Sequence, residues 1–205
     1  PLLVAGSTLE GEEAMLLECF RQVVARYPGA LLVLAPRHPE RFETVAALVA
    51  ASGIRWQRRS QWDGQQPLGG GVFLLDSIGE LASLYQFADL AFVGGSLVPK
   101  GGHNVLEAAQ FGIPIIVGPS TENFRDIIGV FQRSDALLVV RPQSLTSTVL
   151  ALLQDEAERA RLGQSALAVM QQQQGATERT IAALLQLLPA ELDADASAVT
   201  SERPA

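Results

Sequence analysis

The sequence predicts an α/β protein in which a mostly parallel sheet of about six strands carries helices on both faces. Short apolar runs alternate with amphipathic helical runs through most of the chain. The apolar runs do not alternate with polar residues, which is typical of strands buried on both faces. Repeated strand and helix units of this kind indicate a doubly wound domain with three layers.

The candidate elements follow one another with short connections. Strands are predicted at residues 2–6, 30–36, 54–59, 72–76, 90–94, 113–118 and 137–140, and helices between them at 10–27, 39–52, 79–88, 103–111 and 122–133. Three further helical segments, 142–155, 156–175 and 176–188, follow without an intervening strand, with Gly175 separating the last two. Residues 189–205 have no apolar period, so we expect a domain at 1–188 and a disordered tail at 189–205.

Composition excludes several classes of function. The chain has 205 residues, 48% of them hydrophobic, and a formal charge of −7, which argues against nucleic-acid binding. Its single cysteine, Cys19, lies in a helical run and is expected to be a buried apolar residue. Two histidines without acidic residues at ligand spacing do not predict a metal site. No signal peptide or run of about 20 apolar residues is present.

In an open parallel sheet, ligands bind at the carboxyl ends of the strands, so the loops that follow strands are the candidate sites. In the first loop, "GSTLEGEEAML", Ser7 or Thr8 is expected to cap the following helix, with Glu10 at capping-box distance from Ser7. This helix end presents N–H groups that favour an anion, although Glu12 and Glu13 disfavour a phosphate directly there.

The second loop, "LAPRHPERF", holds Arg37 and His38 between Pro36 and Pro39. The guanidinium of Arg37 suits a phosphate or carboxylate, and a salt bridge to a nearby acid is the alternative. In the third loop, "LLDSIGELASLY", Gly79 permits close approach of the backbone, but the segment also fits an ordinary strand-to-helix turn.

The fourth loop, "FVGGSLVPKGGHNVLEAAQFG", is longer than a plain connection between a strand and a helix. Its helix is expected to begin near His103 or Asn104, with N–H groups open to a phosphate and Lys100 beside them. Glu107 lies one turn later on the face of Asn104, where its carboxylate can accept ribose hydroxyls. A glycine-rich turn with a solvated lysine and a capping asparagine is the alternative.

Together these motifs resemble the 3-deoxy-D-manno-octulosonic acid (Kdo) transferase family. The similarity covers about residues 3–135 and is carried by "GSTLEGEE", "PRHPERF" and "GELASLYQFADLAFVGGSLVPKGGHNVLEAAQFGIPIIVGPSTENFRDI". It implies that the chain is the C-terminal, Rossmann-like three-layer half of a GT-B glycosyltransferase. Ala108 stands where the family usually has proline.

The resemblance implies that this half binds the donor, CMP-Kdo. The implied nucleotide contacts are Pro36, Arg37, Ile78, Gly79, Glu80, Asn104, Val105, Leu106 and Glu107. The full-length protein would transfer Kdo with inversion to a lipid A precursor at the cytoplasmic face of the bacterial inner membrane. The resemblance implies no metal and no cofactor.

The resemblance also places the catalytic base in an N-terminal acceptor domain that is absent from this chain. We therefore expect a soluble fragment without transferase activity and without catalytic residues of its own. The chain starts at Pro1 directly with a strand, so we expect that domain, headed by a membrane anchor, upstream.

Two alternatives remain open. The chain could belong to another GT-B enzyme, such as a UDP-sugar transferase or an epimerase, because a phosphate-binding loop does not define the base. It could also be a stand-alone nucleotide-binding module. In the family's fold the last helix crosses to the other domain, so segment 176–188 is expected to be mobile or to pack on a neighbouring molecule.

Overall fold

The structure, a computed structural model, describes the backbone of residues 1–187 and the side chains of residues 1–172 and 185. The predicted tail, the packing of segment 176–188 and the end of the predicted domain at residue 188 therefore stay predictions, since they lie outside these described parts. The chain divides into two units, Pro1–Met170 and Gln171–Ala205, and the first contains the whole sheet.

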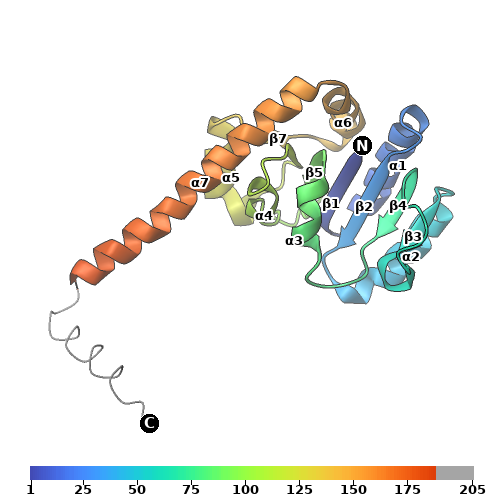
Figure 1. Ribbon diagram of the computed structural model, residues 1–205, viewed down its shortest axis with the longest axis horizontal. Helices are drawn as coiled ribbons and strands as arrows, with labels where there is room; N and C mark the ends of the chain where they lie inside the picture. The colour runs from blue at the N-terminus through green and yellow to red at the C-terminus, as the bar shows by residue number, and fades with distance from the viewer. Residues whose placement is uncertain (188–205) are drawn as a thin grey trace, which may run out of the picture. The chain divides into compact units, whose positions relative to one another are not determined.

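The sheet has seven strands in the order β3-β4-β2-β1-β5-β6-β7, and every neighbouring pair is parallel (Figure 1). The strands are β1 (Leu2–Thr8), β2 (Leu31–Pro36), β3 (Trp56–Arg58), β4 (Gly71–Leu74), β5 (Leu90–Val93), β6 (Ile115–Val117) and β7 (Leu138–Val139). The parallel α/β class is therefore confirmed, and the seven strands fall in the seven predicted segments, close to the expected number of about six.

The helices are α1 (Glu12–Arg26), α2 (Phe42–Ala51), α3 (Leu81–Leu84), α4 (Leu106–Ala109), α5 (Arg125–Arg133), α6 (Leu145–Gln154) and α7 (Glu156–Leu187). Short 3₁₀ turns are η1 (Pro39–Arg41), η2 (Arg59–Gln61), η3 (Tyr85–Phe87), η4 (Glu122–Phe124) and η5 (Pro142–Ser144). Among the described residues, no helix combines the length and the hydrophobicity that crossing a bilayer requires.

The two faces of the sheet build two separate cores. Successive residues of a strand point to opposite faces, so Leu3 and Ala5 of β1 pack with α1, α2 and α6, whereas Val4 packs with η3, α4 and α5. Both sets of side chains are almost fully buried, which explains the continuous apolar strands in the sequence.

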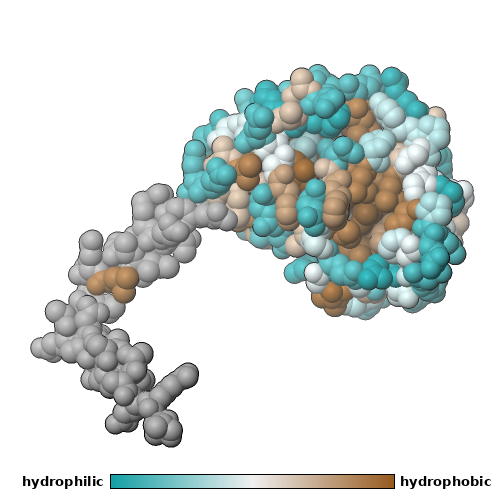
Figure 2. All heavy atoms as spheres, viewed as in Figure 1, coloured by the Kyte–Doolittle hydropathy of each residue, from teal (hydrophilic) through white to brown (hydrophobic). Residues whose placement is uncertain are grey.

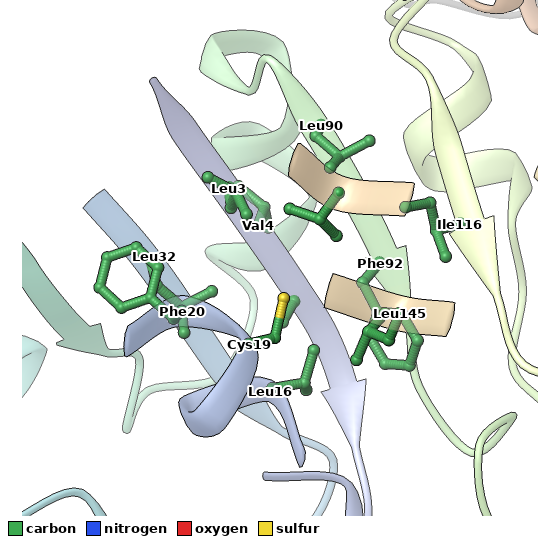
Figure 3. A pocket seen from close by; sticks show the side chains of 12 residues that line it. Leu3, Val4, Leu16, Cys19, Phe20, Leu32, Leu90, Phe92, Ile116 and Leu145 are labelled. Atoms are coloured by element: carbon green, nitrogen blue, oxygen red, sulfur yellow. The ribbon is translucent and has the colours of Figure 1, made fainter. Parts of the chain in front are cut away.

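The first core contains a small void between the sheet, α1 and α6 (Figure 3). Its volume is about 20 Å³, close to the size of one water molecule, and the side chains around it, such as Leu16, Phe92 and Leu145, are apolar. The thiol of Cys19 faces this void, and burial raises its pKa to about 11. We regard the void as a packing feature of the core.

Two predicted helices are shorter in the structure, and two others form one continuous helix. The segment 79–88 forms only α3 followed by η3, and the segment 103–111 forms only the four residues of α4. Gly101 and Gly102 have φ angles of 82° and 76°, so a helix cannot extend back across them, and the side chain of Asn104 accepts the N–H of Leu106, the residue at which α4 begins. In contrast, α7 continues through Gly175, because one glycine among good helix formers costs only about 1 kcal/mol.

Candidate functional site

The carboxyl ends of the strands lie at one edge of the sheet, and the strand order reverses at β1. The chain runs from β1 to β2 on one side and later returns to β5 on the other side of β1. A crevice at such a reversal is the usual ligand site of open α/β sheets. The four loops singled out in the sequence all lead away from this edge (Figure 1).

The first loop does not have the predicted cap. Ser7 and Thr8 belong to β1, and α1 begins after Gly11, whose φ is 95° and which makes no side-chain cap. The capping-box prediction for Glu10 is therefore wrong. The register between β1 and β2 shifts at Ser7, which has a positive φ of 56°. Positive φ at a non-glycine residue stores strain, and such strain concentrates at functional sites.

The carboxylate of Glu12 holds the start of the glycine-rich loop. It is fully buried and accepts the N–H groups of Gly95, Ser96 and Leu97 at 2.7, 2.9 and 2.9 Å, and that of Leu9 at 2.9 Å. These N–H groups are consequently not available to a ligand. The first half of the loop is thus a structural support, and only its second half can bind an anion.

Glu13 binds the second loop to α1. Its carboxylate, 1% exposed, accepts two bonds from the Arg41 guanidinium at 2.6 and 3.1 Å and one from the hydroxyl of Thr8 at 3.0 Å. The hydrogen bond to Glu13 raises the pKa of Arg41. Arg41 is therefore occupied, whereas no ion pair forms on the Arg37 side chain within the described residues.

A small cavity brings together four of the predicted contacts. It has a volume of about 90 Å³ and is lined by Ser7, Ala35, Pro36, Arg37, Phe42, Leu75, Ser77, Ile78, Gly79 and Leu81. Pro36 and Arg37 follow β2, whereas Ile78 and Gly79 follow β4. The side chain of Ile78 is 78% exposed and Gly79 has a φ of 89°, so an exposed apolar group and a left-handed turn stand at the rim.

Glu80 is placed beside this cavity but faces other protein groups. Its carboxylate accepts the hydroxyl of Ser77 at 2.5 Å and the Arg59 Nε at 2.9 Å. The Ser77 hydrogen bond, and then the Arg59 hydrogen bond, lower the pKa of this carboxyl group. Glu80 therefore shapes the segment around Gly79, and both of its oxygens already have partners.

The second half of the glycine-rich loop presents open backbone donors. Asn104 accepts the Leu106 N–H at 3.0 Å through its side-chain oxygen, and α4 begins at Leu106. Among the described residues, the N–H groups of His103, Asn104 and Val105 donate no hydrogen bond. The predicted start of the helix at residue 103 or 104 is wrong, and open loop amides take the place of a helix end.

The predicted contact residues around α4 differ in how far they are exposed to solvent. Asn104 and Glu107 are exposed and Leu106 is half-buried, whereas Val105 is fully buried, backbone included, and presents no atom to a ligand. Burial, and then the charge of Glu107, raise the pKa of the buried Tyr85. This influence places Glu107 close to η3.

His103 marks the meeting of the second and fourth loops. Its pKa is lowered by burial, and then by the charges of Arg37 and His38. Its Nε2 atom is buried without a hydrogen-bond partner in the described structure, and the ring packs against Gly95. A neutral imidazole with a free ring nitrogen therefore lies beside Arg37. Within the described residues, no group of three potential ligands could hold a metal ion.

A larger hollow of about 400 Å³ has Glu80 in its lining. It is lined by Arg59, Trp62, Asp63, Gly64, Phe73, Glu80 and Leu84. The rings of Trp62 and Phe73 meet edge to face at 5.5 Å between centroids. Figure 2 shows that, on the face in view, apolar side chains gather in the middle and polar ones surround them.

Sequence reasoning missed the structural role of Glu12 and the part of Ser7 in the cavity. Two adjacent acids at the start of a buried helix were the available signal for Glu12, since a buried carboxylate must find donors. No signal in the sequence marked Ser7 as a bulge residue.

Comparisons with known proteins agree on one group. The family model "Glycosyl transferases group 1" matches residues 15–169. The chain is 40% identical over 183 residues to 3-deoxy-D-manno-octulosonic acid transferase of Haemophilus influenzae, covering 88% of this chain and 43% of that protein. For the enzyme of Bordetella pertussis the identity is 38% over 188 residues, with 90% and 44% covered. The chain thus spans less than half the length of these relatives.

Solved structures extend this agreement to the fold. The C-terminal CMP-Kdo binding domain of WaaA from Acinetobacter baumannii superposes with a TM-score of 0.77 and 34% identity, covering 83% of this chain and 89% of that one. Anabaena Alr3699/HepE in complex with UDP matches with a TM-score of 0.63 and 18% identity, over 91% of this chain and 49% of that one. The second likeness concerns the fold alone.

Proposed function

The chain belongs to the glycosyl transferases group 1 family and, within it, to the Kdo transferases, and on this premise we propose that it binds the donor CMP-Kdo. It acts as the donor half of a longer enzyme that transfers Kdo to a lipid A precursor in lipopolysaccharide biosynthesis. That enzyme works at the cytoplasmic face of the bacterial inner membrane. An N-terminal domain supplies the acceptor site and the catalytic base.

The base and ribose of the nucleotide bind along the crevice at the strand ends. The cavity between Pro36 and Gly79 takes the edge of the base, and the exposed side chain of Ile78 covers one face of the ring. The carboxylate of Glu107 is exposed and accepts the ribose hydroxyls. Glu80 keeps the Gly79 segment in place through its bonds to Ser77 and Arg59.

The phosphate binds between the second and fourth loops. Arg37 supplies a positive charge there, and the unpaired N–H groups of His103 and Asn104 supply donors. Asn104 orients these donors because its side chain accepts the N–H of Leu106. When CMP leaves, negative charge grows on the phosphate oxygens, and preorganised donors stabilise this charge in the transition state.

One observation carries this proposal. Pro36 and Arg37 come from the loop after β2, Ile78 and Gly79 from the loop after β4, and all four line one cavity at the carboxyl edge of the sheet. The family resemblance assigns the same four residues to the nucleotide.

A thermal-shift comparison of CMP and UDP tests the proposal. A ligand at 100 times its dissociation constant stabilises the folded protein by about 2.7 kcal/mol, so CMP should raise the melting temperature clearly. A shift with UDP and none with millimolar CMP would refute the CMP-Kdo assignment and favour a UDP-sugar enzyme of the same fold. No shift with either nucleotide would refute donor binding by this domain.

A further inference from the structure

Two consecutive arginines bind the two ends of the segment 76–80, which carries Ile78 and Gly79. The Arg58 Nε donates to the Asp76 carboxylate at 2.8 Å, and the Arg59 Nε donates to the Glu80 carboxylate at 2.9 Å. Arg58 ends β3, which is parallel to β4 and pairs with it, with Arg58 opposite Leu74. The arginines therefore stand at the same edge of the sheet as the segment they bind.

The bond at Asp76 belongs to a network of hydrogen bonds around a buried carboxylate. The Asp76 side chain is 2% exposed and also accepts the Ser60 N–H at 2.8 Å and the Ser60 hydroxyl at 2.6 Å. Burial raises the pKa of Asp76, but the hydrogen bonds from Ser60 and Arg58 together lower it below its ordinary value. Arg58 also donates to Glu43 of α2 at 3.0 and 2.6 Å, so this end of the segment is fixed to α2 as well.

The ion pair between Arg59 and Glu80 is more exposed to solvent than the bond at Asp76. The side chains of Arg59 and Glu80 are 38% and 39% exposed, and the Ser77 hydroxyl completes the coordination of the carboxylate. Glu80 directly precedes α3, so this pair fixes the point at which the segment enters that helix.

The tip of the segment has almost no packing of its own. Ile78 is 78% exposed, and a Cβ added to Gly79 would meet nothing within 4 Å. A tip without neighbours takes its conformation from its two fixed ends. Those ends are Asp76 and Glu80, each bound by one arginine.

We propose that Arg58 and Arg59 are positioning residues that preorganise segment 76–80 for the nucleotide base without touching the nucleotide. This inference rests on the proposed function, because it assumes that Ile78 and Gly79 contact the base. A loop that is ordered before binding loses less conformational entropy when the ligand arrives, which increases affinity. Arg58 fixes the buried end, and Arg59 fixes the end that leads into α3.

The test compares Arg59→Met with Arg59→Lys and with the control Arg161→Met. Arg161 forms an ion pair with Glu158, with side chains 49% and 36% exposed, so the control removes a pair of similar exposure away from the segment. CMP affinity is measured by calorimetry and the melting temperature by thermal denaturation. Hydrogen exchange of the amides of residues 77–80 is measured without ligand. We expect Arg59→Met to bind CMP about tenfold more weakly at an unchanged melting temperature.

Amide exchange in segment 77–80 should become faster in Arg59→Met only, and Arg59→Lys should recover most of the affinity, since a lysine can still pair with Glu80. Unchanged CMP affinity in Arg59→Met would overturn the inference. Weaker binding with unchanged exchange would also overturn it, because Arg59 would then contact the nucleotide directly. If the wild-type chain does not bind CMP, the proposed function itself fails, and the exchange data alone then decide whether Arg59 orders the segment.

Discussion

The carboxylate of Glu12 accepts the N–H of Gly95 at 2.7 Å, although 83 positions separate the two residues in the chain. The same buried carboxylate accepts three further backbone N–H groups. It joins the start of α1 to the loop after β5, across the point where the strand order reverses. Glu12 therefore holds the loop after β5 in place at the crevice, and because it is buried a ligand cannot reach it.

Replacing Glu12 with glutamine is expected to destabilise the fold. The amide nitrogen of glutamine would face N–H donors, leaving at least one buried donor unsatisfied, at a cost of about 3 kcal/mol. Urea unfolding followed by circular dichroism measures the change. Glu18→Gln is the matched control on the same helix, because its partner Arg21 is 52% exposed and such pairs contribute at most about 1 kcal/mol. Equal stability of the two variants would contradict the role of Glu12.

Because of Asp76, the stability of the fold should decrease at acid pH. Its folded pKa lies below the ordinary value of 3.8, because hydrogen bonds from Ser60 and Arg58 outweigh the opposite effect of burial. Its contribution is therefore fully present above pH 3.8 and is lost as the pH falls through the folded pKa. Asp76→Asn should lose about 3 kcal/mol at pH 7, since Arg58 loses its buried partner, and should depend less on pH below 4. Urea unfolding of the wild type and of Asp76→Asn, repeated from neutral to acid pH, measures this difference. If the free energy of unfolding changes equally with pH in both proteins, the prediction is contradicted.

Removing the side chains proposed for phosphate and ribose should weaken CMP binding without unfolding the protein. Arg37→Ala and Glu107→Ala should each weaken affinity by about tenfold, because charge-assisted hydrogen bonds contribute about 1.5–3 kcal/mol. Isothermal calorimetry with CMP measures the effect. Arg26→Ala and Glu156→Ala, exposed residues on α1 and α7, are the matched controls and should bind as the wild type does. Affinity that is unchanged in all four variants would remove Arg37 and Glu107 from the site.

Gly79→Ala separates backbone conformation from packing. A Cβ at this position meets no atom within 4 Å, yet the φ of 89° disfavours alanine, so the stability loss should be only about 1 kcal/mol. Gly53→Ala is the matched control, because Gly53 has a φ of 72° and equally open space, but follows α2 far along the chain from the cavity residues. We expect both variants to lose similar stability in thermal denaturation and only Gly79→Ala to lose CMP affinity. Equal affinity in both would exclude the Gly79 turn from the site.

Cys19 should be unreactive in the folded protein. Burial raises its pKa to about 11, so almost no thiolate is present at pH 8, and the thiol faces the core void. Labelling with a chromogenic disulfide reagent should therefore be slow in buffer and fast in concentrated urea. Rapid labelling of the native protein would show that the first core opens readily.

The elements of the fold could be predicted from the sequence because their signals are local. Continuous apolar runs such as residues 30–36 and 90–94 identified buried parallel strands, and β2 and β5 lie within them. Pro39 was correctly expected at the start of the next turn, because its fixed φ suits a first helical position. The least accurate predictions were the short helices α3 and α4, where left-handed glycines and tertiary contacts decide the ends.

The candidate site was only partly predictable for the same reason. Arg37 and Gly79 could be chosen because parallel strands bring the loops that follow them to one edge. The sequence did not reveal that Glu80 is bound to Arg59, or that Arg41 is bound to Glu13, because both depend on which strands become neighbours. Thus periodicity and turn residues determined the α/β class and the loops to consider, since these are properties of consecutive residues. Only the tertiary structure decided which N–H groups of the glycine-rich loop remain open, because Glu12 reaches that loop through the strand order and not through the chain.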